Sequence, residues 1–445
     1  MTAAIIAFSL TIGFILLIRY LRKKNERTTA ARLKERWGKK RTDYANFELV
    51  GLYEKFVDQG DSKISPETCN DLDFDEVFSA IDHTSSRVGQ QYLYNHIRQG
   101  KADQKWLTEF EKVVQFLDGN IELRLKAVTI LDKLNHRSDY YFPLLFQDAP
   151  IQRIKYIWAI QLLQTFTFTS FALLFIYPSF FFLFLLSVTL SIGVHYWNKW
   201  QVEKYQHILK RFKKFFDTAK EVTDIQKENG FFYDEAQEEH VWKLRKISKK
   251  LRLISFGGNQ GSEAEQITGL FIELFNIITL AEVSAFNRFF EQLPSFKKDF
   301  FSLFASIGTI DIAVSVASWR SSLPTYTTPD FCENKKRLAV ENAVHPLVKN
   351  CVANSLTLEN QSMILTGSNM AGKTTFIRTV ALNALFAQTL QTVLATKYVA
   401  PVFKISSAIR FQDDLTDGQS YYLREVEGIK KLLNEAENTT PTLFI

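Results

Sequence analysis

Cysteine is scarce in this chain of 445 residues, and metal-binding sequence patterns are missing from it. Its three cysteines, Cys69, Cys332 and Cys351, are widely spaced and form no C-x-x-C motif. An odd, scattered set argues against a disulfide framework, so we expect reduced, mostly buried thiols on the cytoplasmic side. The seven histidines include no H-E-x-x-H motif and no Cys/His cluster. We therefore predict no structural zinc.

A strong net charge and internal repeats are also lacking. The formal net charge of +6 permits an anionic partner but does not require one. No repeated segment is visible along the chain. The length is sufficient for two or three domains, so we expect more than one hydrophobic core.

Charged side chains are absent from Tyr156 to Asn198. Two apolar runs of membrane-spanning length, Tyr156–Tyr177 and Ser179–Trp197, lie in this stretch and meet at Pro178. Tryptophan and tyrosine gather near the ends of the runs, and lysine or arginine flanks both sides, as at membrane interfaces. We predict a transmembrane helical hairpin at residues 153–200, with both flanks in the cytoplasm.

A buried helical hairpin of a soluble core is the alternative for this region. Gln161, Gln164 and several threonines would suit such a core. The membrane interpretation is favoured because no Asp, Glu, Lys or Arg interrupts either run.

The amino terminus carries a shorter apolar run, Ala3–Ile18, which arginine and lysine follow at once. We interpret residues 1–24 as an uncleaved transmembrane anchor. A cleaved signal peptide is the alternative, but it would place positive charge before the run. Residues 25–44 then form a basic juxtamembrane segment, although such a segment could also touch anionic lipid or nucleic acid. The three predicted transmembrane helices indicate a multi-pass protein of the inner (cytoplasmic) membrane, with its other domains in the cytoplasm.

The most informative motif is G-x-x-x-x-G-K-T, a phosphate-binding loop. Met363–Leu365 suits a buried strand before the loop, and apolar residues recur at helical spacing after it. Lys373 would reach the β- and γ-phosphates, and the Thr374 hydroxyl would ligate Mg²⁺. A chance glycine turn with a surface lysine is the alternative. The predicted nucleotide-binding residues are Gly367, Ser368, Asn369, Met370, Ala371, Gly372, Lys373, Thr374 and Thr375.

Helical patterns fill most of the chain outside this motif. We predict a helical core in two parts, residues 45–152 and residues 201–332, of which the second serves as a lever. From 333 to 445, short apolar runs alternate with helices, as a parallel α/β sheet requires. Two basic clusters, Lys210–Lys214 and Lys243–Lys250, could contact DNA. A solvated helix face explains them equally well, since acidic residues interleave between them.

The loop and its surroundings resemble one known family. The sequence G-S-N-M-A-G-K-T-T is similar to the G-P-N-M-G-G-K-S-T loop of MutS-type ATPases, with Asn369-Met370 as the specific mark. Residues 341–348, E-N-A-V-H-P-L-V, resemble the family's G-R-H-P-V-V stretch, and residues 413–420, D-D-L-T-D-G-Q-S, resemble its D-D-L-x-x-G-x-S segment. The resemblance is strong from about residue 335 onward.

Upstream, the resemblance is weaker. The stretch from Asp82 to Gly89 looks like the start of the family's helical core, and the stretch from Ile310 to Ala313 looks like the helix that re-enters it. The two membrane regions have no counterpart in the family.

The resemblance implies a fold of class α + α/β. A helical MutS-like core with transmembrane helices would precede a truncated, phosphate-loop ATPase domain of the ABC type. It further implies ATP and Mg²⁺ as cofactors and a homodimer, in which Ser420 contacts ATP bound to the partner subunit. On sequence alone Ser420 could equally be an ordinary helix N-cap.

The chain departs from the family pattern in three respects. Leu443–Ile445 resembles the strand that ends in the Asp-Glu pair of Walker B, and the printed chain stops before that pair. We therefore expect ATP hydrolysis of the full-length protein only, with no catalytic residue here beyond Lys373. Cys351 stands where the family often has an aromatic ring against adenine. No mismatch-reading domain is found, so duplex DNA as a partner rests on analogy.

These observations lead to one main hypothesis and its rivals. The main hypothesis is a membrane-anchored, MutS-like, ATP-driven dimer switch that acts on DNA in mismatch repair or recombination, without mismatch reading. The chief alternative is a mechanochemical module that acts on membrane partners, with DNA binding lost. A transporter ATPase fused to its own spans is weaker, because no intramembrane ion pair marks a substrate route.

Overall fold

The computed structural model describes most of the chain in two compact units. The described residues are 31–43, 45–57, 60, 63–101, 103–147, 156–250, 273–368, 371–409, 426, 428–430, 432–434 and 441–445. The first unit comprises residues 1–54, 58–133 and 308–445, and the second comprises 55–57 and 134–307. The predicted anchor Ala3–Ile18 lies outside the described residues.

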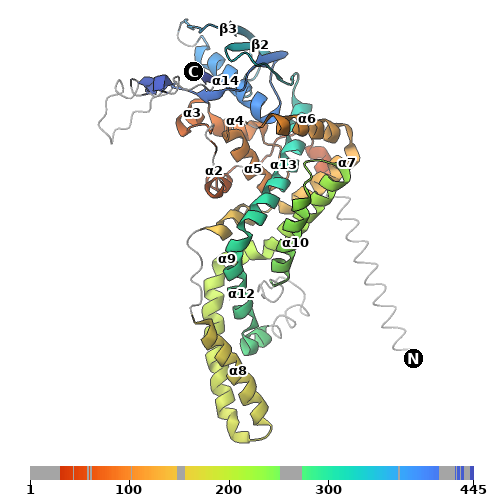
Figure 1. Cartoon of the computed structure of the whole chain (residues 1–445), viewed down its shortest axis with the longest axis vertical. Helices are drawn as coiled ribbons and strands as arrows, with labels where there is room; N and C mark the ends of the chain where they lie inside the picture. Colours follow the sequence, from red (N-terminus) through yellow and green to blue (C-terminus); the bar gives the residue numbers. More distant parts are fainter. Residues whose placement is uncertain are drawn as a thin grey trace, which may run out of the picture. The chain divides into compact units, whose positions relative to one another are not determined.

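The first unit begins with short helices, as the sequence predicted for residues 45–150. Their amino-terminal ends are fixed by polar side chains: Ser86, Asp103 and Asn120 each accept a hydrogen bond from the backbone of the helix that follows. These helices are α2 (Phe47–Val50), α3 (Pro66–Asp71), α4 (Phe74–Ile81), α5 (Arg87–Arg98), α6 (Gln104–Gly119) and α7 (Ile121–Leu131) (Figure 1). The short helices η1 (Tyr53–Phe56) and η2 (Asp132–Leu134) have residues in both units.

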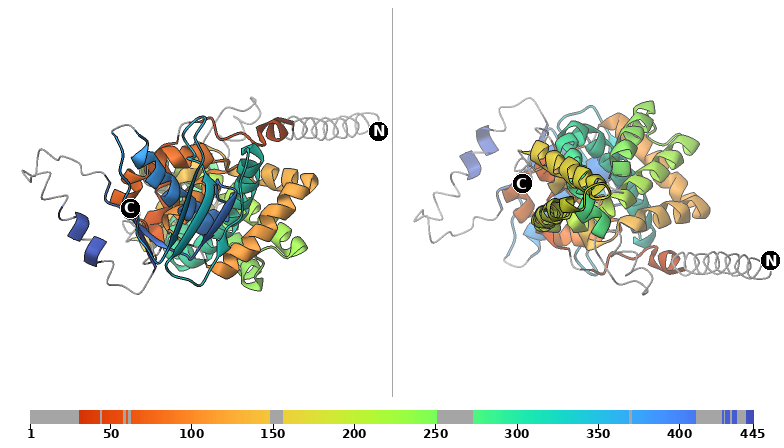
Figure 2. Two further views of the ribbon diagram at one scale, coloured as in Figure 1. Left: turned by 90° about the horizontal axis from the view of Figure 1, so that it is seen from above. Right: turned by 90° about the horizontal axis from the view of Figure 1, so that it is seen from below.

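Two small sheets and one helix complete the first unit. A four-stranded sheet has the order β1-β4-β2-β3, and a two-stranded sheet pairs β5 with β6. Helix α14 (Lys373–Leu390) lies beside the larger sheet (Figure 2, left). The strands are β1 (Asp330–Phe331), β2 (Arg337–Ala343), β3 (Asn354–Glu359), β4 (Lys397–Ala400), β5 (Lys404–Ser406) and β6 (Thr442–Phe444).

The prediction of a parallel sheet from residue 333 onward is wrong for the larger sheet. Strand β2 runs antiparallel to both β3 and β4, and only β1 is parallel to its neighbour β4. A short connection suffices between antiparallel strands such as β2 and β3, whereas parallel neighbours need a long crossover. The strand predicted at Leu443–Ile445 is confirmed as β6, which pairs in parallel with β5.

The second unit is almost entirely helical. Its core is built from phenylalanine: the rings of Phe215 and Phe300 stack with centroids 4.6 Å apart, and Phe142, Phe212 and Phe304 pack around them. The predicted hairpin consists of α8 and the first part of α9, which lie side by side (Figure 2, right). The elements are η3 (Arg137–Phe146), α8 (Ile157–Leu174), η4 (Pro178–Phe180), α9 (Phe181–Asn229), α10 (Glu235–Lys250), α12 (Ala281–Gln292) and η6 (Leu293–Phe296).

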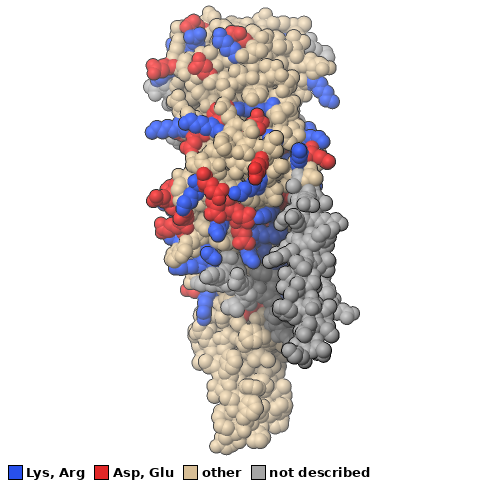
Figure 3. Space-filling view, turned by 90° about the vertical axis from the view of Figure 1, so that its right-hand side faces the viewer, with Lys and Arg blue, Asp and Glu red and all other residues tan. Residues whose placement is uncertain are grey.

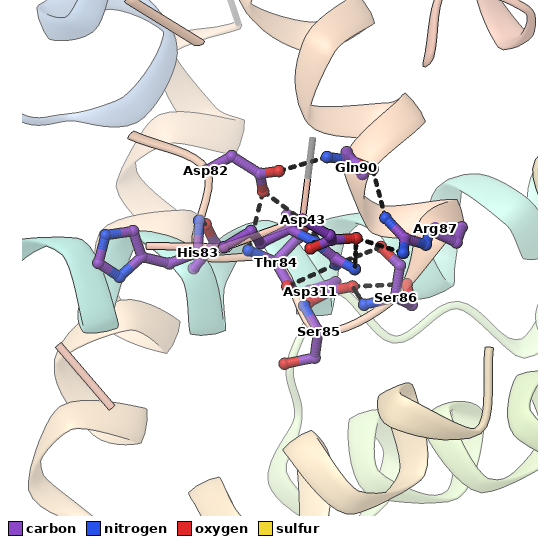
Figure 4. Close-up of polar contacts among 11 residues, drawn as sticks. Asp43, Asp82, His83, Thr84, Ser85, Ser86, Arg87, Gln90 and Asp311 are labelled. Atoms are coloured by element: carbon purple, nitrogen blue, oxygen red, sulfur yellow. Dashed lines mark hydrogen bonds and ion pairs between the residues drawn. The ribbon is translucent and has the colours of Figure 1, made fainter. Parts of the chain in front are cut away.

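Helix α13 (Lys297–Ser322) contributes residues to both units, and the boundary falls between Ile307 and Gly308. It ends at Ser322, two residues before Pro324. In the first unit its Asp311 is fully buried and accepts hydrogen bonds from the backbone N–H groups of Ser85 and Ser86, both at 2.8 Å. The Ser86 hydroxyl donates a third, at 2.5 Å (Figure 4). Burial raises the pKa of Asp311 to about 6, and these hydrogen bonds oppose that rise.

A second set of contacts surrounds Asp311. Asp82 accepts hydrogen bonds from the Thr84 hydroxyl and the Gln90 amide, both at 2.6 Å. Arg41 donates to the Thr84 carbonyl at 2.9 Å and pairs with Asp43. Arg41 had been grouped with the basic juxtamembrane segment, yet its side chain is buried in the folded unit. The two stretches that separately resemble parts of the helical core are therefore joined by direct hydrogen bonds.

We expect Gly89→Ala to destabilise the first unit by about 3 kcal/mol, because overpacking costs a few kcal/mol when no flexible side chain can yield. A Cβ at Gly89 would lie 2.0 Å from the Asp311 carboxylate, which three hydrogen bonds hold in place. The matched control is Gly119→Ala, whose Cβ meets no atom within 4 Å. Thermal unfolding of the two variants should differ clearly, and equal melting temperatures would contradict this account of the network.

Candidate nucleotide site

The predicted phosphate loop lies directly before helix α14. Gly372 is the N-cap residue with φ of +82°, a left-handed conformation that glycine adopts without strain. Lys373 is the first residue of the helix, followed by Thr374 and Thr375, and the N-cap glycine has no side chain to cap the helix amino terminus. The predicted helical spacing after the loop is thus confirmed. Asn369 and Met370 lie outside the described residues.

The Lys373 ammonium lies over the loop. Its Nζ donates to the Gly367 carbonyl at 2.5 Å and to the Ser368 carbonyl at 2.7 Å. The site therefore combines a cation, an exposed threonine hydroxyl at Thr374 and the uncapped amino terminus of an 18-residue helix. Such a donor set suits a polyphosphate anion, since helix N–H groups and the helix dipole both favour negative charge.

The strand predicted before the loop is absent. Met363–Leu365 pairs with no strand among the described residues, and the Ile364 side chain is 91% exposed. Met363 and Leu365 instead line a cavity of about 640 Å³, together with Leu338, Phe376 and Leu443. An apolar run becomes a strand only when a neighbour takes up its backbone hydrogen bonds, and the described edges of β3 and β6 do not do so here.

The carboxyl end of α14 is held by side chains distant in sequence. The Arg320 guanidinium bonds both oxygens of Glu111, at 2.9 and 2.7 Å, and donates to the Gln391 carbonyl at 2.6 Å. His96 Nε2 lies 2.8 Å from the Thr389 carbonyl. Burial lowers the pKa of His96 to about 4, so the imidazole is neutral at physiological pH and Nε2 carries the proton that it donates. These side chains satisfy carbonyls that a helix leaves unpaired at its end.

Further contacts fix the same end of the helix. The Gln388 amide nitrogen donates to the carbonyls of Gly100 and Phe403, and its oxygen accepts from the Phe403 backbone N–H at 3.0 Å. Helix α14 thus carries the loop at one end and is clamped to α5, α6 and α13 at the other. We call Arg320, Glu111 and His96 the helix clamp.

Arg320→Ala should lower the free energy of unfolding of the first unit by about 3–5 kcal/mol, because removing one partner of a buried pair leaves the other charge unpaired. The Arg320 and Glu111 side chains are 5% and 16% exposed. Arg320→Lys keeps the charge but loses the paired geometry, so we expect a smaller loss. Lys397→Ala removes an exposed ion pair with Glu341 and should change stability by less than about 1 kcal/mol. Chemical denaturation of the three variants checks this order.

The remaining predicted site residues are only partly placed. Ser420 lies outside the described residues. Cys351 is half-buried, and its thiol accepts from the His345 backbone N–H at 3.4 Å. Of the three thiols only Cys69 is buried, so the expectation of mostly buried thiols is wrong. No motif marks the residues of the helix clamp, so sequence patterns did not predict it.

Part of each predicted basic cluster is engaged within the protein. Arg211 forms two hydrogen bonds with the buried Asp139, at 2.7 and 2.6 Å. Lys243 pairs with Glu239 at 2.8 Å and with Asp299 at 3.5 Å. Lys213 and Lys214 are exposed. The clusters are therefore smaller as binding surfaces than the sequence suggested.

Comparison with known proteins shows similarity to MutS proteins. Residues 363–445 match the family model for MutS domain V. The chain is 28% identical over 253 residues to the DNA mismatch repair protein MutS of Thermotoga maritima, covering 54% of this chain and 32% of that protein. It is 27% identical over 226 residues to MutS of Leptospira interrogans, covering 48% and 26%. The match to MutS of Pseudothermotoga lettingae is 37% over 126 residues, covering 27% and 15%. The chain thus spans about a third or less of these relatives.

Proposed function

Because this chain belongs to the MutS family, we propose that it binds ATP with Mg²⁺ and acts as an ATP-driven dimer switch in a DNA transaction related to mismatch repair. The observation that carries this proposal is the position of Lys373 over the phosphate loop, at the amino terminus of α14. The relatives of this chain are named as DNA mismatch repair proteins, which supports the assignment of the pathway.

In this proposal each loop residue has a distinct task. Lys373 holds the β- and γ-phosphates, and backbone N–H groups from Gly367 to Thr375 surround the remaining oxygens. The Thr374 hydroxyl holds Mg²⁺, and Ser420 contacts nucleotide in the partner subunit. Bound Mg²⁺-ATP supplies a phosphoanhydride bond whose cleavage would reset the switch. The loop and α14 belong to a phosphate-loop ATPase domain, whose larger described sheet is antiparallel in part.

Membrane attachment through the α8–α9 hairpin is part of the proposal. On this hairpin small polar side chains are buried and large apolar side chains are exposed, which is the opposite of the usual arrangement in a soluble protein. Thr167, Ser170, Ser187 and Ser191 are buried, and three of their hydroxyls donate to backbone carbonyls of their own helix. Large apolar side chains face outward instead: Phe168, Phe171, Phe175, Phe182, Leu185, Leu186 and Leu190.

This arrangement favours lipid as the surroundings of the hairpin. Small residues let transmembrane helices approach closely, whereas soluble proteins rarely expose apolar patches of this extent. Figure 3 shows no Lys, Arg, Asp or Glu on the visible face of the hairpin, at the bottom of the view. The stretches Ile157–Leu174 and Pro178–Trp200 are long and apolar enough to span a bilayer, and only 17% of the most apolar 18-residue window of each is buried. A third candidate, Ala281–Ser322, is 83% buried, so we assign it to the protein core.

DNA binding is the least supported part of the proposal, and it can be tested directly. The experiment is an electrophoretic mobility shift on duplex DNA with detergent-solubilised full-length protein, over a range of salt. Lys213→Glu with Lys214→Glu should weaken binding and flatten the salt dependence by about 0.9 per lost phosphate contact. Lys397→Glu is the matched control. Matched and mismatched duplexes should bind equally.

The rival function is a mechanochemical module that acts on membrane partners. The specific observation in its favour is the engagement of Arg211 and Lys243 by carboxylates within the protein. Absence of any DNA shift at low salt, with ATP binding intact, would favour this rival over the DNA-acting switch.

A further inference from the structure

A short helical stretch packs against the base of the hairpin. It comprises residues 273–279 and the first turn of α12, together called segment 273–284. The Lys199 ammonium on α9 bonds the Glu273 carboxylate at 2.7 Å. The Gln164 amide on α8 donates to the Thr279 carbonyl at 2.5 Å and to the Ser284 hydroxyl at 3.2 Å. The segment is therefore bound to both helices of the hairpin.

An apolar core reinforces this attachment. Ile160 of α8 packs with Leu280 and Val283 of the segment, all of them buried, and Val194 of α9 lies against the group. Leu280 has φ of +46°, so the chain turns sharply between residues 273–279 and α12. The inner face of the segment therefore packs against the hairpin.

The outer face of the segment is apolar and exposed, as far as the described residues show. Leu274 and Phe275 are 55% and 57% exposed, whereas the adjacent Asn276 and Ile277 are buried. The polar side chain faces the protein and the two large apolar ones face outward, the same reversal as on the hairpin. Glu273, next to them in the chain, is bonded to Lys199, and Lys199 lies between the exposed Trp197 and Trp200 on α9. Leu274 and Phe275 thus directly follow the residue that is bonded to α9 between its two tryptophans in the sequence.

We propose that segment 273–284 is an additional membrane-contacting element, which inserts Leu274 and Phe275 at the boundary between lipid headgroups and acyl chains. The inference rests on the proposed membrane insertion of the hairpin. Tryptophan and tyrosine favour this depth, and an apolar helix face buries there to a depth of several ångströms. The Lys199–Glu273 pair suits the same level, where headgroups and water still solvate charge. The partner of this surface is a phospholipid bilayer.

The test places a fluorescent label at three sites in a variant whose natural cysteines are replaced by alanine. Phe275→Cys probes the segment, Leu186→Cys probes the hairpin, and Ser295→Cys is an exposed control on η6. The full chain is reconstituted in vesicles of phosphatidylcholine and phosphatidylglycerol, with nitroxide lipids that carry the spin label either near the headgroup, to quench a label at Phe275, or deep in the acyl chain, to quench a label at Leu186. We expect loss of fluorescence at Phe275 and Leu186 and none at Ser295. Leu274→Cys repeats the test if Phe275→Cys fails to fold.

The other outcomes distinguish the proposal for segment 273–284 from the proposal for the hairpin. In one outcome the lipid nitroxide quenches the label at Leu186 but not the label at Phe275, and aqueous iodide quenches the label at Phe275. This result would overturn the lipid contact of the segment and leave the hairpin proposal standing. Shielding at Phe275 from both quenchers would indicate a protein cover, such as a second copy, and would also overturn it. No lipid quenching at Leu186 would remove the hairpin proposal and this inference together.

Discussion

Lys373→Ala is expected to lower the affinity for ATP by at least about 100-fold, since two charge-assisted contacts to phosphate contribute roughly 3 kcal/mol or more. The ammonium already lies over the loop, within 2.7 Å of both carbonyls that it bonds. Fluorescence titration with a labelled ATP analogue, on full-length protein in detergent, measures the change. Melting temperatures should stay close to the natural protein's, because the Lys373 side chain is not part of either buried core.

The matched control for this experiment is Lys397→Ala. It also removes an exposed lysine from the first unit, but one that pairs with Glu341 on the neighbouring strand. Its ATP affinity should equal that of the natural sequence. Unchanged ATP binding by Lys373→Ala would refute the nucleotide site, and equal losses in both variants would mean that the effect is indirect.

The second large effect concerns the hairpin. Leu186→Arg combined with Leu190→Arg places two charges one turn apart on its outward face, where both leucines are exposed. Each arginine at the centre of a span costs about 2.5–3.5 kcal/mol on insertion scales, so the pair should cost about 5–7 kcal/mol. In a background that lacks the predicted anchor, residues 1–24, we expect the double variant to leave the membrane fraction on carbonate extraction, while the chain with the natural hairpin stays in it.

Trp242→Arg controls for the general effect of replacing an exposed apolar residue with arginine. Trp242 is exposed on α10, outside the hairpin, and stacks only against the Lys246 ammonium. This variant should remain in the membrane fraction. Retention of the double variant, or extraction of the natural protein by carbonate, would show that the hairpin is a soluble element.

Local sequence patterns predicted the helices and one strand correctly. The 3.6-residue spacing after the phosphate loop gave α14, the two long apolar runs gave α8 and the start of α9, and the last apolar run gave β6. Each of these rests on residues close together in the chain. Periodicity and length are sufficient there, because the helix supplies its own hydrogen bonds.

Such local patterns could not predict contacts between residues that are far apart in the sequence. Ser86 and Asp311 are separated by 225 positions, and Glu111 and Arg320 by 209. An arginine in a helical pattern reads as a solvated residue, and only the fold brings the Glu111 carboxylate and the Gln391 carbonyl to Arg320. The same limit explains the error at Met363–Leu365. An apolar run indicates either a β-strand or an irregular segment that lines a core, and which of the two forms depends on a partner strand that is distant in the sequence.

The lysine in the phosphate loop was identified by its motif, whereas the helix clamp at the other end of α14 was not. The motif residues must present fixed chemistry to an anion, so their types and spacing are constrained. The clamp only has to satisfy carbonyls at the end of the helix, which many combinations of donors can do. Its composition therefore leaves no recognisable trace in the sequence.

Helix α9 runs without interruption over 49 residues, from Phe181 in the hairpin to Asn229 in the phenylalanine core of its unit. Such a helix is roughly 70 Å long and turns by about 100° per residue. The two halves of the helix therefore have a fixed rotation about the helix axis relative to each other. Removing one residue near Trp200 would rotate Phe212 and Phe215 by about 100° relative to the hairpin, away from Phe300. If the hairpin is fixed in a bilayer, the depth and rotation of the hairpin there set the direction in which the aromatic core of the second unit faces.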